Sequence, residues 1–184
     1  MSEQINFIAV TNRRLCKTDF AQRIEFLCES GVSEIILREK DLSEEEYKLL
    51  FLKVSEICQR YNVLLAGNKF EQAVRNLGGK GFQYSFDQFT EKSERHFPVE
   101  GVSVHSADEA LKAESKGADY LIAGHIFSTD CKKGVPPRGL DFLKKVCESV
   151  KIPVYAIGGI NDKNAYDCIK AGAYGICKMS GAMV

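Results

Sequence analysis

Three segments of the chain repeat one pattern, in which a glycine stands just before a short apolar run. They are Gly31-Val-Ser-Glu34, Gly117-Ala-Asp-Tyr120 and Gly172-Ala-Tyr-Gly175. A glycine takes the left-handed conformation that ends many helices, and a short apolar run is typical of a buried strand. Helix–strand units that follow one another require a mainly parallel sheet, because parallel strands are joined by crossover connections. The repeat therefore predicts an α/β protein.

The remaining pattern predicts eight strands separated by helices. The strands are expected at residues 5–10, 34–37, 62–66, 81–84, 101–105, 120–123, 152–157 and 175–179. Residues 85–98 show no firm period. Eight strands with alternating helices fit a (β/α)8 TIM barrel, here a single domain over residues 1–184. Few residues follow the last strand, so the final helix is expected to be truncated or missing. An open doubly wound sheet is the alternative.

Several helix starts carry capping signals. Thr18 or Asp19 is placed to cap the first helix, and Asn161 a later one. Ser43 with Glu46 and Ser106 with Glu109 are spaced as capping boxes. A further helix is expected to begin near Leu140.

Composition excludes several classes of partner. Lysine plus arginine equals aspartate plus glutamate at 25 each, so no long-range field favours nucleic acid or an anionic membrane. No apolar run is long enough to span a bilayer and the N-terminus is polar, which predicts a cytoplasmic protein. The seven cysteines form no Cys-x-x-Cys pair. Small buried thiols are the favoured interpretation over a metal site.

The expected carboxyl ends of the strands are rich in cations and donors and poor in carboxylates. In a barrel these ends converge on one pocket, so the set suits a small anionic ligand. The residues are Thr11, Arg38, Lys40, Asn68, Lys69, Gln83, His105, Ser106, His125, Thr129, Lys132, Gly158, Gly159, Ser180 and Gly181.

Two of these loops predict a phosphate site. Gly158 with Gly159, and Ser180 with Gly181, follow the seventh and eighth strands. Glycines let backbone N–H groups approach an oxyanion closely. The alternative is that the glycines only form tight turns.

The three histidines differ in position. His125 follows a buried strand beside a cationic loop, and an imidazole titrates near neutrality, so His125 is the candidate general acid or base. His105 either orients a ligand or satisfies a turn. His96 is expected on the surface. Cys131 beside Lys132 is a weaker candidate nucleophile, because the sequence places no base next to it.

A family resemblance covers nearly the whole chain. It rests on the segments Leu37–Lys40, Val104–Ser106, Gly124–Gly134, Gly134–Leu140, Ala156–Ile160 and Met179–Gly181. These segments resemble motifs of the thiamine phosphate synthase superfamily, and Gly124–Gly134 resembles its thiazole tautomerase (TenI) branch. The synthases of the superfamily couple a pyrimidine diphosphate to a thiazole phosphate with magnesium.

The chain departs from the synthase pattern at the positions that the resemblance assigns to magnesium. The first motif reads Gly67-Asn68-Lys69, with an amide for a carboxylate, and in the second Asp87 is displaced. Magnesium prefers anionic oxygen ligands. The synthase branch also usually has proline where this chain has His125, whereas the tautomerase branch has histidine.

The resemblance therefore implies a thiazole tautomerase, an isomerase that aromatises a thiazole carboxylate phosphate without a cofactor. It implies His125 as acid/base and a phosphate site at Gly158, Gly159, Ser180 and Gly181. Substrate contacts are expected from Arg38, Lys40, Gln83, His105, Thr129 and Lys132. The alternatives are a thiamine phosphate synthase, which would need magnesium, and a non-catalytic barrel that binds thiazole phosphate. A homodimer is also expected.

Overall fold

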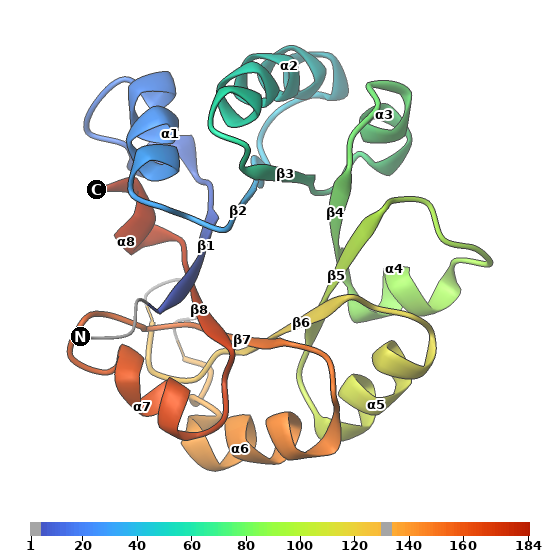
Figure 1. Ribbon diagram of the computed structural model, residues 1–184, viewed down its shortest axis with the longest axis vertical. Helices are drawn as coiled ribbons and strands as arrows, with labels where there is room; N and C mark the ends of the chain where they lie inside the picture. Colours follow the sequence, from blue (N-terminus) through green and yellow to red (C-terminus); the bar gives the residue numbers. More distant parts are fainter. Residues whose placement is uncertain (1–4, 130–133) are drawn as a thin grey trace. The chain divides into compact units, whose positions relative to one another are not determined.

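The computed structural model describes residues 5–129 and 134–184, in which strands and helices alternate along the chain (Figure 1). The strands are β1 (Asn6–Val10), β2 (Glu34–Ile36), β3 (Leu64–Gly67), β4 (Gly81–Ser85), β5 (Val99–Val104), β6 (Tyr120–Gly124), β7 (Val154–Ile157) and β8 (Gly175–Lys178). Their order is that of a closed parallel barrel, β1 to β8 in sequence. This confirms the predicted (β/α)8 fold class.

Each strand is followed by a helix or a helical turn. These are η1 (Arg13–Leu15) with α1 (Phe20–Glu29), α2 (Glu44–Arg60), α3 (Glu71–Asn76), α4 (Phe86–Glu91), α5 (Ala107–Ser115), α6 (Gly139–Ser149), α7 (Ala165–Lys170) and α8 (Ser180–Met183). Helix α8 is a single turn of four residues.

The chain divides into two compact units, which we describe separately. The β1–β3 unit comprises Phe7–Gln83, Glu94–Val99 and Met179–Val184. The β6–β8 unit comprises residues 5–6, Tyr84–Ser93 and Glu100–Lys178.

In the β1–β3 unit the parallel register aligns Val10 with Ile36, and Ile36 with Ala66. Most of the strand residues are apolar and buried, as in parallel strands covered by helices; they are Ile8, Ala9, Val10, Ile35, Ile36, Leu65 and Ala66. Helix α2 covers them with an inner face that includes Tyr47, Phe51 and Val54. The three strands therefore end at matching positions, and the loops that follow them emerge side by side.

In the β6–β8 unit β6 is buried along its whole length. Its register aligns Val104 of β5 with Ala123, and Gly124 with Ile157 of β7. Helix α6 packs Leu143 and Val146 inward at i, i+3 spacing. The loops after β6 and β7 consequently begin at the same level.

The capping predictions are confirmed in part. Asp19 caps α1, and Ser43 with Glu46 forms the full capping box of α2. Ser106 caps α5, but the Glu109 carboxylate accepts the N–H of His105 at 2.7 Å, so the reciprocal bond to Ser106 is replaced. The prediction for Asn161 was wrong, because α7 starts later and Asn161 Oδ1 instead accepts the N–H of Lys163 at 2.9 Å.

Helix α4 lies in the segment whose conformation the sequence pattern did not predict. Ser85 and Gln88 form a complete capping box at its start. A Ser-x-x-Gln signal was present, but the helix is only six residues long and too short to show a period.

The cysteines behave as small core residues. Cys28, Cys58, Cys168 and Cys177 are buried and Cys16 and Cys147 are partly buried, all as free thiols. Burial raises the pKa of Cys58 to about 12 and that of Cys168 to about 11. In residues 5–129 and 134–184, no group of three potential His, Cys, Asp or Glu metal ligands occurs, and no helix is long and apolar enough to cross a bilayer.

Candidate functional site

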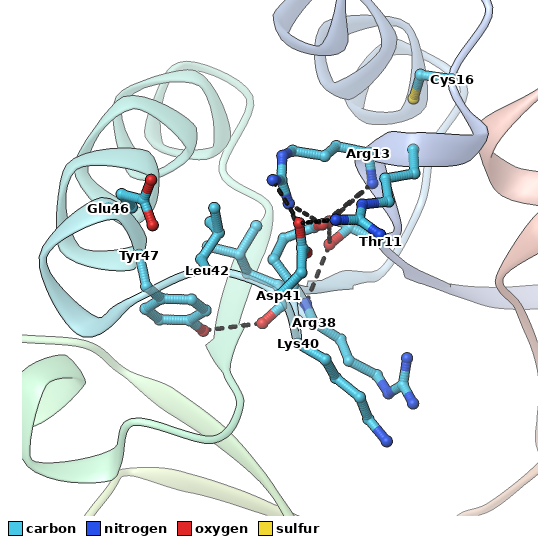
Figure 2. Close-up of polar contacts among 12 residues, drawn as sticks. Thr11, Arg13, Cys16, Arg38, Lys40, Asp41, Leu42, Glu46 and Tyr47 are labelled. Carbon is cyan, nitrogen blue, oxygen red and sulfur yellow. Dashed lines mark hydrogen bonds and ion pairs between the residues drawn. The ribbon is translucent and has the colours of Figure 1, made fainter.

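The loop after β2 presents two cations side by side. Arg38 and Lys40 extend together, away from the cluster around Arg13 and Asp41 (Figure 2). Neither has a carboxylate partner among the described residues, and the guanidinium of Arg38 meets only the Met179 sulfur, at 3.7 Å. The positive charge of Arg38, together with partial burial, lowers the pKa of Lys40. Two unopposed cations repel each other, so a bound anion would stabilise this arrangement.

Between these two cations lies a buried carboxylate. Glu39 is 3 % exposed, and neighbouring residues of an extended segment point to opposite sides. The Thr11 hydroxyl donates to Glu39 Oε1 at 2.7 Å, and the Arg13 N–H donates to both carboxylate oxygens at 3.0 and 3.2 Å. The Arg13 guanidinium donates to Oε2 at 3.0 Å. Charge-assisted hydrogen bonds of this kind offset the cost of burying the carboxylate.

The guanidinium of Arg13 also binds Asp41, at the end of the β2 loop. Arg13 Nη1 and Nη2 donate to the two oxygens of Asp41 at 2.8 and 2.7 Å. The hydrogen bond from Arg13 is the largest influence on Asp41 and lowers its pKa to about 2. Arg13 therefore joins the buried carboxylate of Glu39 to the more exposed carboxylate of Asp41.

The loop is also held from the side of β3. The Tyr47 hydroxyl donates to the Leu37 carbonyl at 2.8 Å and accepts the Asn68 N–H at 2.9 Å. The Lys69 ammonium donates to the Lys40 carbonyl at 3.1 Å and, more weakly, to the Leu42 carbonyl at 3.4 Å. The Lys69 ammonium therefore holds the β2 loop through two backbone carbonyls.

The residues after β3 do not suit a magnesium ion. Asn68 uses its amide nitrogen to donate to the Gln83 carbonyl at 2.8 Å, and Lys69 is cationic. Asp87 lies exposed in the first turn of α4, in the other compact unit. Magnesium requires anionic oxygens in a near-octahedral set. The donors at the end of β3 do not match that requirement, and no step is assigned to the metal.

In the β6–β8 unit His125 follows β6 directly. It was expected at the rim of a pocket, but it is only 4 % exposed. Its Nε2 lies 3.2 Å from the Val135 carbonyl. A carbonyl can only accept, so Nε2 carries the proton and Nδ1 is left as an acceptor. Nδ1 is buried and has no hydrogen-bond partner among residues 5–129 and 134–184. The imidazole therefore retains one acceptor for a ligand.

The glycines after β7 have a packing role. A Cβ on Gly158 would lie 2.3 Å from the Cβ of His125, and one on Gly159 would lie 2.4 Å from the Ser128 carbonyl. Both glycines have positive φ values, 103° and 65°. The N–H groups of Ile126 and Phe127 also donate to the carbonyls of Ile157 and Gly158 at 2.9 and 3.0 Å. Close packing of the β6 loop accounts for both glycines, so they need no phosphate to explain them.

The other predicted site residues lie as follows. Gln83 is buried in β4, Thr129 is partly buried, and the His105 side chain is 40 % exposed with Nδ1 3.5 Å from Glu109. Ser180 and Gly181 are exposed in α8. Lys132 and Cys131 lie outside the described residues. Site roles for all of these stay predictions.

His96 differs from its prediction. Its side chain is only 16 % exposed, and Nδ1 meets the Glu71 carboxylate. His96 is therefore a structural residue that joins the segment before β5 to α3, rather than a free surface histidine.

Sequence reasoning missed three residues of the β2 loop network, namely Glu39, Tyr47 and Arg13. Glu39 appeared only as part of the segment Leu37–Lys40. The one available signal was a single acidic residue between two basic ones, directly after an apolar strand. The partners of Glu39, Arg13 and Thr11, lie 26 and 28 residues earlier in the chain, so no local pattern identifies them.

Comparison with known proteins identifies the family. The family model described as thiamine monophosphate synthase matches residues 7–182. A thiamine-phosphate synthase of Caldanaerobacter subterraneus subsp. tengcongensis is 36% identical over 179 residues, which cover 94% of this chain and 84% of the relative. One of Fusobacterium nucleatum is 34% identical, covering 95% and 87%.

A solved structure agrees with these relatives. The thiamine phosphate pyrophosphorylase of Pyrococcus furiosus superposes with a TM-score of 0.84 at 32% identity, covering 98% of this chain and 88% of that one. The expectation of a thiazole tautomerase was wrong, because these relatives are named as synthases or pyrophosphorylases and favour the synthase alternative. The match over residues 7–182 and the 36% identity over 84% of a thiamine-phosphate synthase show that the chain belongs to the thiamine monophosphate synthase family.

Proposed function

We propose that this protein is a thiamine-phosphate synthase, a transferase that joins a pyrimidine diphosphate to a thiazole phosphate and releases diphosphate. The carbon–oxygen bond to the diphosphate breaks, and that carbon forms a bond to the ring nitrogen of the thiazole. The relatives' names and the family match support the reaction. The observation that carries it in this chain is the unopposed pair Arg38 and Lys40 after β2.

The cation pair fits the leaving group of this reaction. A diphosphate gains negative charge as the bond to carbon breaks, so positive groups that are already in place stabilise the transition state. Arg38 offers a planar fork of donors and Lys40 a compact ammonium, and both are suited to phosphate oxygens. The hydrogen bonds around Glu39 and Lys69 hold the loop, so less ordering remains to be done when the anion binds.

The other proposed contacts come from the residues predicted above. His125 would accept a hydrogen bond from the substrate at Nδ1, with Gln83, His105, Thr129 and Lys132 as further substrate contacts. Gly158, Gly159, Ser180 and Gly181 would supply donors to the thiazole phosphate. We propose no magnesium site at the residues after β3, because the groups around Asn68 do not suit that ion.

The test is to incubate purified protein with the pyrimidine diphosphate and thiazole phosphate, with and without magnesium, and to measure thiamine phosphate and released diphosphate. Arg38→Gln should lower kcat/KM by about 10- to 100-fold, the usual worth of a charged hydrogen bond. Lys53→Gln, which removes an exposed lysine of α2, is the matched charge control and should leave the rate unchanged.

Three outcomes separate the candidate functions. No thiamine phosphate under either condition overturns the proposal. Binding of thiazole phosphate without turnover would favour the non-catalytic barrel. Turnover that appears only with magnesium keeps the transferase and indicates that residues other than those after β3 hold the metal.

A further inference from the structure

On the side of β1, the loop that carries Arg38 and Lys40 is held by the buried hydroxyl of Thr11. Thr11 is the first residue after β1 and is 0 % exposed. Its hydroxyl accepts the Arg38 N–H at 3.0 Å and donates to Glu39 Oε1 at 2.7 Å. The Thr11 N–H also donates to the Ile36 carbonyl at 3.0 Å, which continues the pairing of β1 with β2. Thr11 therefore contacts the backbone on which the first cation stands.

The direction of these hydrogen bonds gives the hydroxyl a defined role. Glu39 has no proton to give when ionised, so the Thr11 hydrogen must point to the carboxylate. This orientation leaves the oxygen lone pairs for the Arg38 N–H. A hydroxyl that donates to a carboxylate is also a better acceptor, because hydrogen bonds in a chain polarise one another. The charge of Glu39 thus strengthens the bond that fixes Arg38.

The far end of the loop is fastened independently. Arg13 holds Asp41 through two hydrogen bonds, and Lys69 holds the Lys40 carbonyl. Figure 2 shows the labelled Arg38 and Lys40 leaving this cluster in the same direction. Between the two fastened ends, the spacing of the two cations depends on where the Arg38 backbone is held.

We propose that Thr11 is a positioning residue for anion binding: its hydroxyl, oriented by Glu39, sets the backbone of Arg38 and so the spacing of the Arg38–Lys40 pair that meets the diphosphate. This inference rests on the proposed function for the identity of the anion. Thr11 itself does not touch the substrate. Its effect passes through Arg38.

The substitutions are Thr11→Val, which keeps the shape and removes the hydroxyl, and Thr11→Ser, which restores it. The matched control is Ser33→Ala. Ser33 also joins β1 to β2 through a hydroxyl, with its Oγ donating to the Phe7 carbonyl at 2.8 Å, but it does so before β2 begins. If the Thr11 hydroxyl only strengthened the pairing of β1 with β2, Thr11→Val and Ser33→Ala would lower the diphosphate affinity by similar factors.

The first measurement is calorimetric titration with inorganic diphosphate. Thr11→Val should weaken binding by about tenfold, the worth of one hydrogen bond. Thr11→Ser should stay within about twofold of wild type on the same scale, and Ser33→Ala should bind like wild type. In turnover, the loss in Thr11→Val should appear in KM for the pyrimidine diphosphate and not in KM for the thiazole phosphate.

The second measurement needs no ligand. Lysines are labelled by 13C-methylation and the Lys40 signal, assigned with Lys40→Arg, is titrated by NMR. The pKa of Lys40 is lowered mainly by the charge of Arg38, so a displaced Arg38 in Thr11→Val should let that pKa rise toward its ordinary value. Thr11→Ser and Ser33→Ala should leave it lowered. Thr11→Ala replaces Thr11→Val if the valine variant does not fold.

The two proposals fail in different ways. Wild-type protein that binds diphosphate while Thr11→Val binds it equally well, with an unchanged Lys40 pKa, overturns the positioning role alone. Equal losses in Thr11→Val and Ser33→Ala overturn it too, because they indicate general loosening of the β1–β2 pair. If wild-type protein neither binds nor releases diphosphate, the proposed function is wrong. The NMR titration of Lys40 then still decides whether Thr11 positions the Arg38–Lys40 pair.

Discussion

The end of β2 and the end of β6 both place polar side chains after a buried strand, but they hold them by opposite means. After β2 the loop is held by charge: Glu39 and Asp41 share the guanidinium of Arg13, and the buried hydroxyl of Thr11 links Glu39 to the backbone of Arg38. After β6 the loop is held by close packing, since His125 presses against Gly158, where no side chain fits.

This contrast shows where each loop is vulnerable. A network of charged hydrogen bonds tolerates small changes of shape but fails when a buried partner is removed. A close backbone contact tolerates changes of charge but fails when one carbon is added. The two loops belong to different compact units, so each can be tested without reference to the other.

Adding one carbon after β7 should have the largest effect. In Gly158→Ala the new Cβ would meet the His125 Cβ at 2.3 Å on a backbone with φ of 103°. Strain and overpacking together should lower the free energy of unfolding by roughly 3 kcal/mol or more. Urea denaturation followed by circular dichroism measures it.

Gly117→Ala is the control for backbone strain, because Gly117 has φ of 89° and an added Cβ there would have nothing within 4 Å. It should cost about 1 to 2 kcal/mol, the strain of a left-handed residue. Equal losses in the two variants would show that packing against His125 contributes nothing.

Removing the charge of Glu39 should have the next largest effect. Glu39→Gln keeps the shape but turns one acceptor oxygen into a donor facing Thr11 or Arg13. We expect a loss of about 2 to 3 kcal/mol in unfolding free energy, because buried charged hydrogen bonds are broken. Asp41→Asn should cost less, because that carboxylate is more exposed: its side chain is 27% exposed against 1% for Glu39. The same denaturation measurement compares them, and a reversed order would contradict a network centred on Glu39.

The stability that Asp41 contributes should depend on pH in the acid range. Arg13 lowers the pKa of Asp41 from 3.8 to about 2. A lowered pKa means that the stabilisation by the ionised carboxylate is complete above about pH 4 and is lost as the pH falls through about 2. The stability difference between wild type and Asp41→Asn should therefore be constant from about pH 7 to about pH 4 and shrink below it. A difference that already shrinks between about pH 6 and pH 5 would contradict the lowered pKa.

The smallest effect is expected in cysteine alkylation. The rates for one buried cysteine in each compact unit should be similarly low. Burial raises the pKa of Cys58, in the β1–β3 unit, to about 12 and that of Cys168, in the β6–β8 unit, to about 11. Neither forms much thiolate at about pH 8, so both should react slowly with iodoacetamide. Peptide mapping by mass spectrometry gives the rates. Fast labelling of one of them alone would indicate that its unit opens more readily.

The strands and most helices could be predicted from sequence because their signals are local. Apolar runs, helix-ending glycines and the Ser43–Glu46 capping box each depend on residues a few positions apart. Local signals failed where a different group, near or far along the chain, took the place of the expected partner. The Glu109 carboxylate accepts the His105 N–H, and His96 is covered by Glu71.

The candidate site was predictable as a set of residues but not as an arrangement. Arg38, Lys40 and His125 were named because they directly follow predicted strands. Their surroundings were not, because Thr11 and Arg13 meet Glu39 across 28 and 26 residues of sequence. The family resemblance identified the superfamily correctly but the branch wrongly, since a single histidine in a short motif weighs less than similarity along the whole chain.

Local sequence was enough to establish a parallel (β/α)8 protein with cations after its strands, because periodicity and helix stops act over short distances. Only the folded chain shows that Glu39 is buried between Arg38 and Lys40 and that Gly158 is a contact surface for His125. Parallel pairing aligns β1 with β2 and β6 with β7. That alignment places residues far apart in the chain within hydrogen-bonding or van der Waals distance, and no local pattern encodes it.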